Sequence, residues 1–310
     1  MLINIREELC ISCCWSIDKW SHGVSGHIFE IIEYYYILRE KYDTCILLGD
    51  PRMSRDWLHK LLVDKYNFNL DEIHDIISST RFCEYPPTYV KCDKILFVDG
   101  CLVKMQAEGI KVFSNQIYTF KCSRYETIYD LQLYKNVVPL LDYRVYTGIN
   151  QRDVDIGINY IKKVLIDRLR KSEQTEENTG MLYLTSNCRA LDRGTIMGIC
   201  DLYNIDKYII VTDSDNYFSL PGDKFTIMKP PVDNLFEKFS TYIYTPTDRR
   251  WDGSPRFPVE CHHHQKHVIY HNIGEQYLEH DLGLNVRIQD IDNCFDELYL
   301  KHTDDILKII

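Results

Sequence analysis

The chain has 310 residues, a hydrophobic fraction of 45%, a charged fraction of 26% and a formal net charge of −10 at pH 7. This composition is typical of a globular protein and excludes a fibrous or wholly disordered chain. The acidic balance argues against tight nonspecific binding to nucleic acid, which depends on Lys and Arg. At about 100 to 200 residues per domain, the length favours two domains.

The sequence predicts a cytoplasmic protein without a membrane span, in the host cytoplasm if the chain is viral. No stretch approaches the roughly 18 uninterrupted apolar residues that cross a bilayer. Residues 1–20 carry charged side chains where a secretory signal has its apolar region. The 12 cysteines are scattered along the chain, so we expect reduced, partly buried thiols rather than a disulfide framework.

The first half of the chain alternates strand-like and helix-like segments. A short apolar run at residues 9–17 leads into the turn-like residues 21–26 (SHGVSG), which open a helix over residues 27–41. Residues 44–48 then read as a second strand. Ser54 is a suitable N-cap for the helix that follows. This order is the start of a β-α-β fold.

Further strands are expected at residues 94–98 (KILFV), 111–121 and 137–146. A helix over residues 153–170 precedes the polar stretch 171–180 (KSEQTEENTG), which is typical of a linker. The pattern is that of a sheet of mostly buried parallel strands.

The alternation restarts beyond residue 180. Strands are expected at residues 181–184, 208–212, 224–228, 241–245 and 268–270, and helices at residues 194–203, 234–239 and from about 292 to the end. We therefore predict an α/β protein with an N-terminal Rossmann-like domain over residues 1–150 and a C-terminal Rossmann-like domain over residues 151–310.

The most informative stretch is residues 242–271. A strand ends in a polar loop, and Gly253 and Ser254 then precede Pro255. Proline is suited to the first position of a helix because an N–H group there has no partner within the helix. The stretch therefore predicts a glycine-containing loop followed by a helix start.

The start of this helix has the properties of an anion site. The N–H groups of Ser254, Arg256 and Phe257 would form a positive helix terminus. One turn further, the Glu260 carboxylate is placed to accept hydrogen bonds from ribose hydroxyls while the N–H groups hold a diphosphate. The alternatives are a Glu260 that is an ordinary surface carboxylate of the helix and an Arg256 on a solvated face.

This order of loop, helix start, Glu260 and return strand at residues 267–270 (HVIY) resembles the donor half of GT-B glycosyltransferases. The strand at residues 181–184, followed by Ser186 and Arg189, resembles the first strand of that donor half and the loop that contacts phosphates. The resemblance covers about residues 180–272. It departs from the family where three histidines follow Cys261 in place of small residues.

The resemblance implies a fold and an activity. The fold is the GT-B architecture of two Rossmann-like domains facing a cleft, whose closure excludes water. The activity is hexosyl or pentosyl transfer from a nucleotide-sugar, with a UDP-sugar favoured, to a hydroxyl acceptor without a required cofactor. The segment also resembles phage and viral enzymes, some of which glycosylate hydroxymethylated DNA bases. A glycan, a small molecule and modified DNA are thus the acceptors to consider, with Arg52, Arg55 and Lys60 offering positive charge for the last.

The N-terminal half matches the family only in outline. Gly23, Ser25 and Gly26 lie between a predicted strand and a predicted helix, where small residues let a ligand approach the backbone.

Three side chains of this half are candidate general bases for the acceptor hydroxyl. His27 begins the predicted helix, and its ordinary pKa near neutrality suits the role. Asp99 follows the KILFV strand, where ligands of open α/β sheets gather. Asp18 is the third candidate. A structural or merely exposed histidine is the alternative for His27.

Metal binding is not expected at the histidine run, because adjacent residues of a helix point in different directions and only a pair such as His263 and His267 could share an ion. Asp213 and Asp215 form a DxD pair after a strand, which would hold Mg²⁺ or Mn²⁺ in a GT-A-type transferase. The other rivals are an epimerase or oxidoreductase of Rossmann type and a sugar-binding protein without catalytic activity. A full GxGxxG with a following acidic strand end, as dinucleotide-binding enzymes have, is not found.

Overall fold

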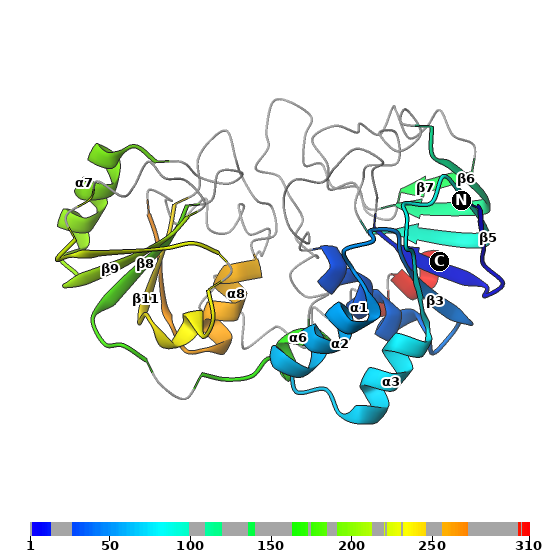
Figure 1. Cartoon of the computed structure of the whole chain (residues 1–310), viewed down its shortest axis with the longest axis horizontal. Helices are drawn as coiled ribbons and strands as arrows, with labels where there is room; N and C mark the ends of the chain where they lie inside the picture. The colour runs from blue at the N-terminus through cyan, green and yellow to red at the C-terminus, as the bar shows by residue number, and fades with distance from the viewer. Residues whose placement is uncertain are drawn as a thin grey trace. The chain divides into compact units, whose positions relative to one another are not determined.

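The computed structural model divides the chain into two compact units (Figure 1). The first unit comprises Met1–Arg170 and Gly283–Ile310, and the second comprises Lys171–Leu282. The structure describes residues 2–13, 27–98, 109–119, 136–139, 163–172, 175–184, 191–212, 220, 222–230, 232–245, 256–271, 303–304 and 306–310. The expected domain boundary at residues 150 and 151 lies outside these ranges.

The first unit is built on a parallel sheet of seven strands. Its strands are β1 (Leu2–Asn4), β2 (Leu9–Ser12), β3 (Thr44–Leu48), β4 (Thr80–Phe82), β5 (Tyr89–Phe97), β6 (Lys111–Thr119) and β7 (Val137–Pro139). The order is β4-β3-β2-β5-β6-β7, and β1 pairs with the first residues of β5. Counted from β2, this is the 3-2-1-4-5-6 order of a Rossmann fold.

Described helices of this unit are α1 (His27–Leu38), α2 (Arg55–Asp64), α3 (Leu70–Ser78) and α6 (Lys163–Arg168). The predicted N-cap of α2 is confirmed, because the Ser54 side chain accepts a hydrogen bond from the Trp57 amide. Helix α3 was not expected from the sequence. It begins with a capping box. The Asn69 side chain accepts a hydrogen bond from the Glu72 amide, and the Glu72 side chain accepts one from the Asn69 amide.

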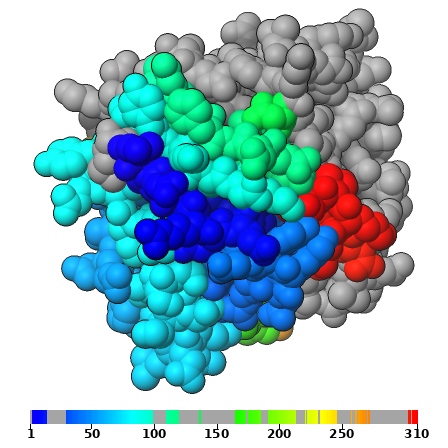
Figure 2. Space-filling model, turned by 90° about the vertical axis from the view of Figure 1, so that its right-hand side faces the viewer, coloured from blue at the N-terminus to red at the C-terminus, as the bar shows by residue number. Residues whose placement is uncertain are grey.

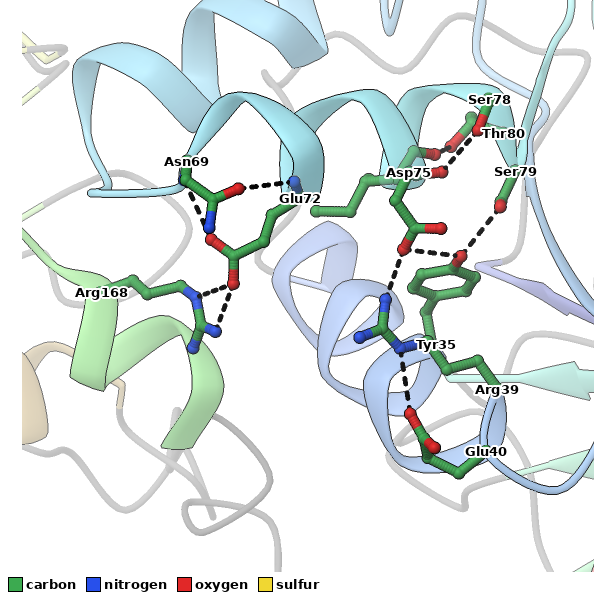
Figure 3. Close-up of polar contacts among 11 residues, drawn as sticks. Tyr35, Arg39, Glu40, Asn69, Glu72, Asp75, Ser78, Ser79, Thr80 and Arg168 are labelled. Atoms are coloured by element: carbon green, nitrogen blue, oxygen red, sulfur yellow. Dashed lines mark hydrogen bonds and ion pairs between the residues drawn. The ribbon is translucent and has the colours of Figure 1, made fainter.

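Polar contacts join α1, α3 and α6 (Figure 3). The Tyr35 hydroxyl donates to Asp75 at 3.1 Å, and Arg39 pairs with the same carboxylate. Arg168 donates from Nε to Glu72 at 3.1 Å. These contacts hold α6 on the helical layer of the first unit.

A buried carboxylate fixes the start of α6. Glu33 of α1 is fully buried and accepts hydrogen bonds from the amides of Val164 at 3.0 Å and Leu165 at 2.7 Å. The first amides of a helix have no acceptor within the helix, so Glu33 satisfies two of them.

The last residues of the chain pack on the first unit. Residues 303–304 and 306–309 are helical, and Lys41 donates to the Leu307 carbonyl at 2.6 Å. The Tyr118 hydroxyl donates to the Ile310 carbonyl at 3.1 Å. In Figure 2 these residues, in red, lie against the surface of the first unit.

The second unit has a parallel sheet of five strands in the order β10-β9-β8-β11-β12. The strands are β8 (Thr179–Tyr183), β9 (Lys207–Val211), β10 (Phe225–Met228), β11 (Thr241–Tyr244) and β12 (His267–Tyr270). The helices are α7 (Arg193–Tyr203), the short 3-10 helix η4 (Leu235–Glu237) and α8 (Arg256–His263). Counted from β8, the order is 3-2-1-4-5, the first five strands of the Rossmann order.

The predicted fold class is thus confirmed: each half is an α/β unit on a parallel, Rossmann-ordered sheet. The seven cysteines in the described ranges are buried in the hydrophobic cores and form no disulfide with one another. No helix in these ranges combines the length and the hydropathy that crossing a bilayer requires.

Candidate nucleotide site

The strand order of the second unit defines a position at the carboxyl edge of its sheet. β8 lies in the middle, with β9 and β10 on one side and β11 and β12 on the other. Ligands of open α/β sheets bind outside the carboxyl ends of the strands where the order reverses in this way. β8 ends at Tyr183 and β11 at Tyr244, so the expected ligand position lies beyond these two ends.

The first turn of α8 lies beside this position. The Phe257 ring is 5.5 Å from the Tyr183 ring and 4.9 Å from the Tyr242 ring, measured between centroids. Phe257 is in the first turn of α8, and Tyr183 is the last residue of β8. The N–H groups of a first helical turn attract anions. The carboxyl end of β8 and the start of α8 therefore form one candidate anion site.

Glu260 is buried, with 2% of its surface exposed. The alternative that it is an ordinary surface carboxylate is therefore wrong. Burying a carboxylate is costly unless hydrogen bonds or charges compensate it. Burial raises the pKa of the neighbouring Cys261 thiol, and the charge of Glu260 raises it further. Glu260 is thus a buried carboxylate in the second turn of α8, the helix whose first turn forms part of the candidate anion site.

Most of the other predicted site residues lie outside the described ranges. These residues are Asp18, Gly23, Ser25, Gly26, Asp99, Ser186, Arg189, Gly253, Ser254 and Pro255. His27 and Arg256 are described in their backbone, as the first residues of α1 and α8. In sequence, Ser186 and Arg189 follow β8, and residues 253–255 follow β11. Their roles stay predictions.

The first unit has the corresponding position between β2 and β5. The Val98 amide donates to the Ser12 carbonyl at 2.9 Å, and the Ser12 hydroxyl donates to the Leu47 carbonyl at 2.7 Å. In the second unit the Thr212 hydroxyl donates to the Leu184 carbonyl at 2.6 Å. Buried hydroxyl groups thus join neighbouring strands at the carboxyl edges of both sheets.

Asp50 is a strand-end acid that sequence reasoning did not single out. It follows β3, the second strand of the Rossmann order, where dinucleotide-binding folds carry an acid for ribose. Here its carboxylate accepts a hydrogen bond from the Arg52 amide at 2.9 Å and from Arg52 Nε at 2.9 and 3.0 Å. Partial burial opposes ionisation, but these bonds lower the pKa of Asp50. The charge of Arg52 is thereby paired within the chain.

The histidines after Glu260 have different surroundings. The His264 ring stacks on Phe236 at a centroid distance of 4.0 Å, and its Nδ1 accepts a hydrogen bond from the Ser172 amide at 3.2 Å. Within the described ranges, no three His, Cys, Asp or Glu side chains are grouped to hold a metal ion. Asp213 and Asp215 lie outside those ranges.

Comparison with known proteins adds a structural likeness. No protein-family model matches the chain, and no curated protein matches it. Among solved structures, the chain is similar to the apo form of the lipopolysaccharide outer core galactosyltransferase WaaB, at 11% sequence identity and a TM-score of 0.42, over 99% of each chain.

Proposed function

We propose that the protein is a glycosyltransferase of the GT-B type, which binds a nucleotide-sugar on its second unit and a hydroxyl acceptor on its first unit. The observation that carries the proposal is the position of the buried Glu260 in the helix that follows the fourth strand of the Rossmann order. The first turn of this helix lies beside the end of β8.

The chemistry follows from that arrangement. The first N–H groups of α8 would stabilise the diphosphate leaving group, which is an electrostatic role that needs no metal ion. The Glu260 carboxylate would accept hydrogen bonds from the ribose hydroxyls of the nucleotide. A UDP-sugar is the donor that we favour. If the reaction inverts the anomeric centre, a base of the first unit, with His27 and Asp99 as first candidates, takes the proton of the acceptor hydroxyl.

The test is nucleotide binding, measured by thermal shift and calorimetry with UDP, GDP, CDP, ADP and NAD, each with and without Mg²⁺. A ligand that binds only the folded state raises the melting temperature. We expect one nucleoside diphosphate to bind without Mg²⁺. Glu260→Gln, which keeps the side-chain shape, should weaken this binding by about tenfold, since a hydrogen bond to a charged group contributes roughly 1.5 to 3 kcal/mol.

Asp201→Asn is the matched control, because Asp201 is an exposed carboxylate of α7 in the same unit. The melting temperature of each variant without ligand separates lost binding from lost folding. Binding that requires Mg²⁺ and is equal in wild type and Glu260→Gln would reject the proposal in favour of a GT-A-type site at Asp213 and Asp215. Binding of NAD alone would favour an oxidoreductase or epimerase. Donor binding without turnover against any hydroxyl acceptor would indicate a sugar-binding protein.

A further inference from the structure

The chain passes from the first unit to the second between Arg170 and Lys171. Up to Arg170, the backbone is held by the first unit. Asn67 donates its amide to the Arg168 carbonyl at 2.6 Å, and Arg170 donates its amide to the Lys65 carbonyl at 3.3 Å. The Arg170 side chain donates from Nε to the Tyr66 carbonyl at 3.4 Å.

From Ser172 onwards, the backbone is held by the second unit. The Ser172 amide donates to Nδ1 of His264 at 3.2 Å. The Glu176 amide donates to the Glu237 carbonyl at 2.9 Å, and the Lys266 ammonium contacts the Thr175 hydroxyl. The change of partner from one unit to the other therefore takes place at one residue, Lys171.

Ring stacking and a backbone hydrogen bond position His264 for this contact. Its ring lies nearly parallel to the Phe236 ring, at 12° and a centroid distance of 4.0 Å. Its own amide donates to the Glu260 carbonyl at 3.0 Å. An imidazole nitrogen accepts a hydrogen bond only when it carries no proton, so the ring acts here as an acceptor at Nδ1.

We propose that Lys171 is the hinge at this crossing and that His264 is the anchor that confines the hinge to that residue. Hinge residues absorb backbone rotation where the chain on either side is held by a rigid element. Without the His264 acceptor, the freely rotating segment would extend beyond Lys171 into residues that the anchor holds. The anchor follows α8 directly, so it also ties the hinge to the helix that carries Glu260.

The first test is amide hydrogen exchange of the wild-type protein, read residue by residue by NMR or fragmentation mass spectrometry. We expect the Lys171 amide to exchange faster than the amides of Arg170 and Ser172. Equal protection of all three amides would overturn the hinge. No nucleotide is involved, so this result is independent of the proposed function.

The second test uses substitutions of His264. His264→Phe keeps an aromatic ring on Phe236 but removes the acceptor, whereas His264→Asn keeps an acceptor near the position of Nδ1 and removes the ring. We expect His264→Phe to speed exchange of the Ser172 amide on the order of fivefold, the effect of losing one hydrogen bond. His264→Asn should keep most of the protection.

His267→Phe, at the exposed start of β12, is the matched control and should leave the Ser172 amide unchanged. The Glu176 amide, which is bonded to a backbone carbonyl, reports in each variant whether the segment remains folded. Trypsin cleavage after Lys171 should be faster in His264→Phe than in wild type or His267→Phe. Equal Ser172 exchange in wild type and His264→Phe, with Glu176 still protected, would overturn the anchor.

Discussion

Gly180 lies in β8 directly beside Tyr208 of β9, and the structure predicts that any side chain at this position destabilises the second unit. A methyl group at this position would stand 2.8 and 2.9 Å from two carbons of the Tyr208 ring and 3.2 Å from Cδ1 of Ile205. Carbon atoms in contact prefer about 3.5 to 4.0 Å. The ring would have to withdraw by about half an ångström or more.

The Tyr208 ring is held against such a movement. Its hydroxyl donates to the Cys200 carbonyl at 2.9 Å and accepts from the Ile205 amide at 3.2 Å, and its face packs on Phe225. Overpacking costs about 1 to 3 kcal/mol, and a broken buried hydrogen bond about 1 kcal/mol more. The lower chain entropy of unfolded alanine offsets roughly 0.5 to 1 kcal/mol. We expect Gly180→Ala to lower the free energy of unfolding by about 2 kcal/mol.

Amide exchange in β8 and β9 measures this loss within the second unit. A loss of about 2 kcal/mol corresponds to roughly 30-fold faster exchange of amides that open by unfolding. The control is Gly198→Ala in α7, where no heavy atom lies within 4 Å of the added methyl. It should slow exchange, because alanine favours a helix over glycine by about 1 kcal/mol. A Gly180→Ala variant as stable as wild type would refute the reasoning.

Three further predictions concern both units. Glu33→Gln removes one acceptor from the buried start of α6 and should speed exchange of the Val164 and Leu165 amides by roughly 5- to 150-fold, which corresponds to a loss of about 1 to 3 kcal/mol. Unchanged exchange of these two amides would refute the role of Glu33 as a cap. Burial raises the pKa of Cys92 and Cys200 to about 12. In the unfolded chain these thiols ionise at lower pH than in the folded chain, so the free energy of unfolding should fall as the pH rises from about 9 to 12. Cys200→Ala should make the alkaline unfolding of the second unit less dependent on pH. Asn69→Ala removes the acceptor for the Glu72 amide and should cost about 1 kcal/mol in thermal unfolding, which a wild-type melting temperature would contradict.

Local patterns were sufficient to predict most strands and the Rossmann alternation. Residues 44–48 are strand β3 as expected, because an apolar run bounded by polar residues is typical of a buried parallel strand. Ser54 caps α2 as expected, because capping depends on neighbouring residues only. Helix α3 was missed although its signal was present, since Asn69 is followed three residues later by Glu72.

Features that depend on contacts between distant residues could not be predicted. Phe257 of α8 packs on the rings of Tyr183 and Tyr242, and Glu260 of the same helix is buried. The role of His264 depends on Ser172, which is 92 positions away in sequence. The sequence predicts no metal at the histidine run, but it does not show that the contacts of His264 in space are a backbone amide and an aromatic ring.

The division of the chain has a consequence for its folding. The second unit is one continuous segment, Lys171–Leu282, whereas the first unit combines Met1–Arg170 with Gly283–Ile310. Domains generally fold as units. The second unit can therefore fold from consecutive residues alone, while the first also uses the residues that Lys41 and Tyr118 hold. A fragment that ends at residue 282 should thus keep its second unit protected from protease, while its first unit is less protected than in the full chain.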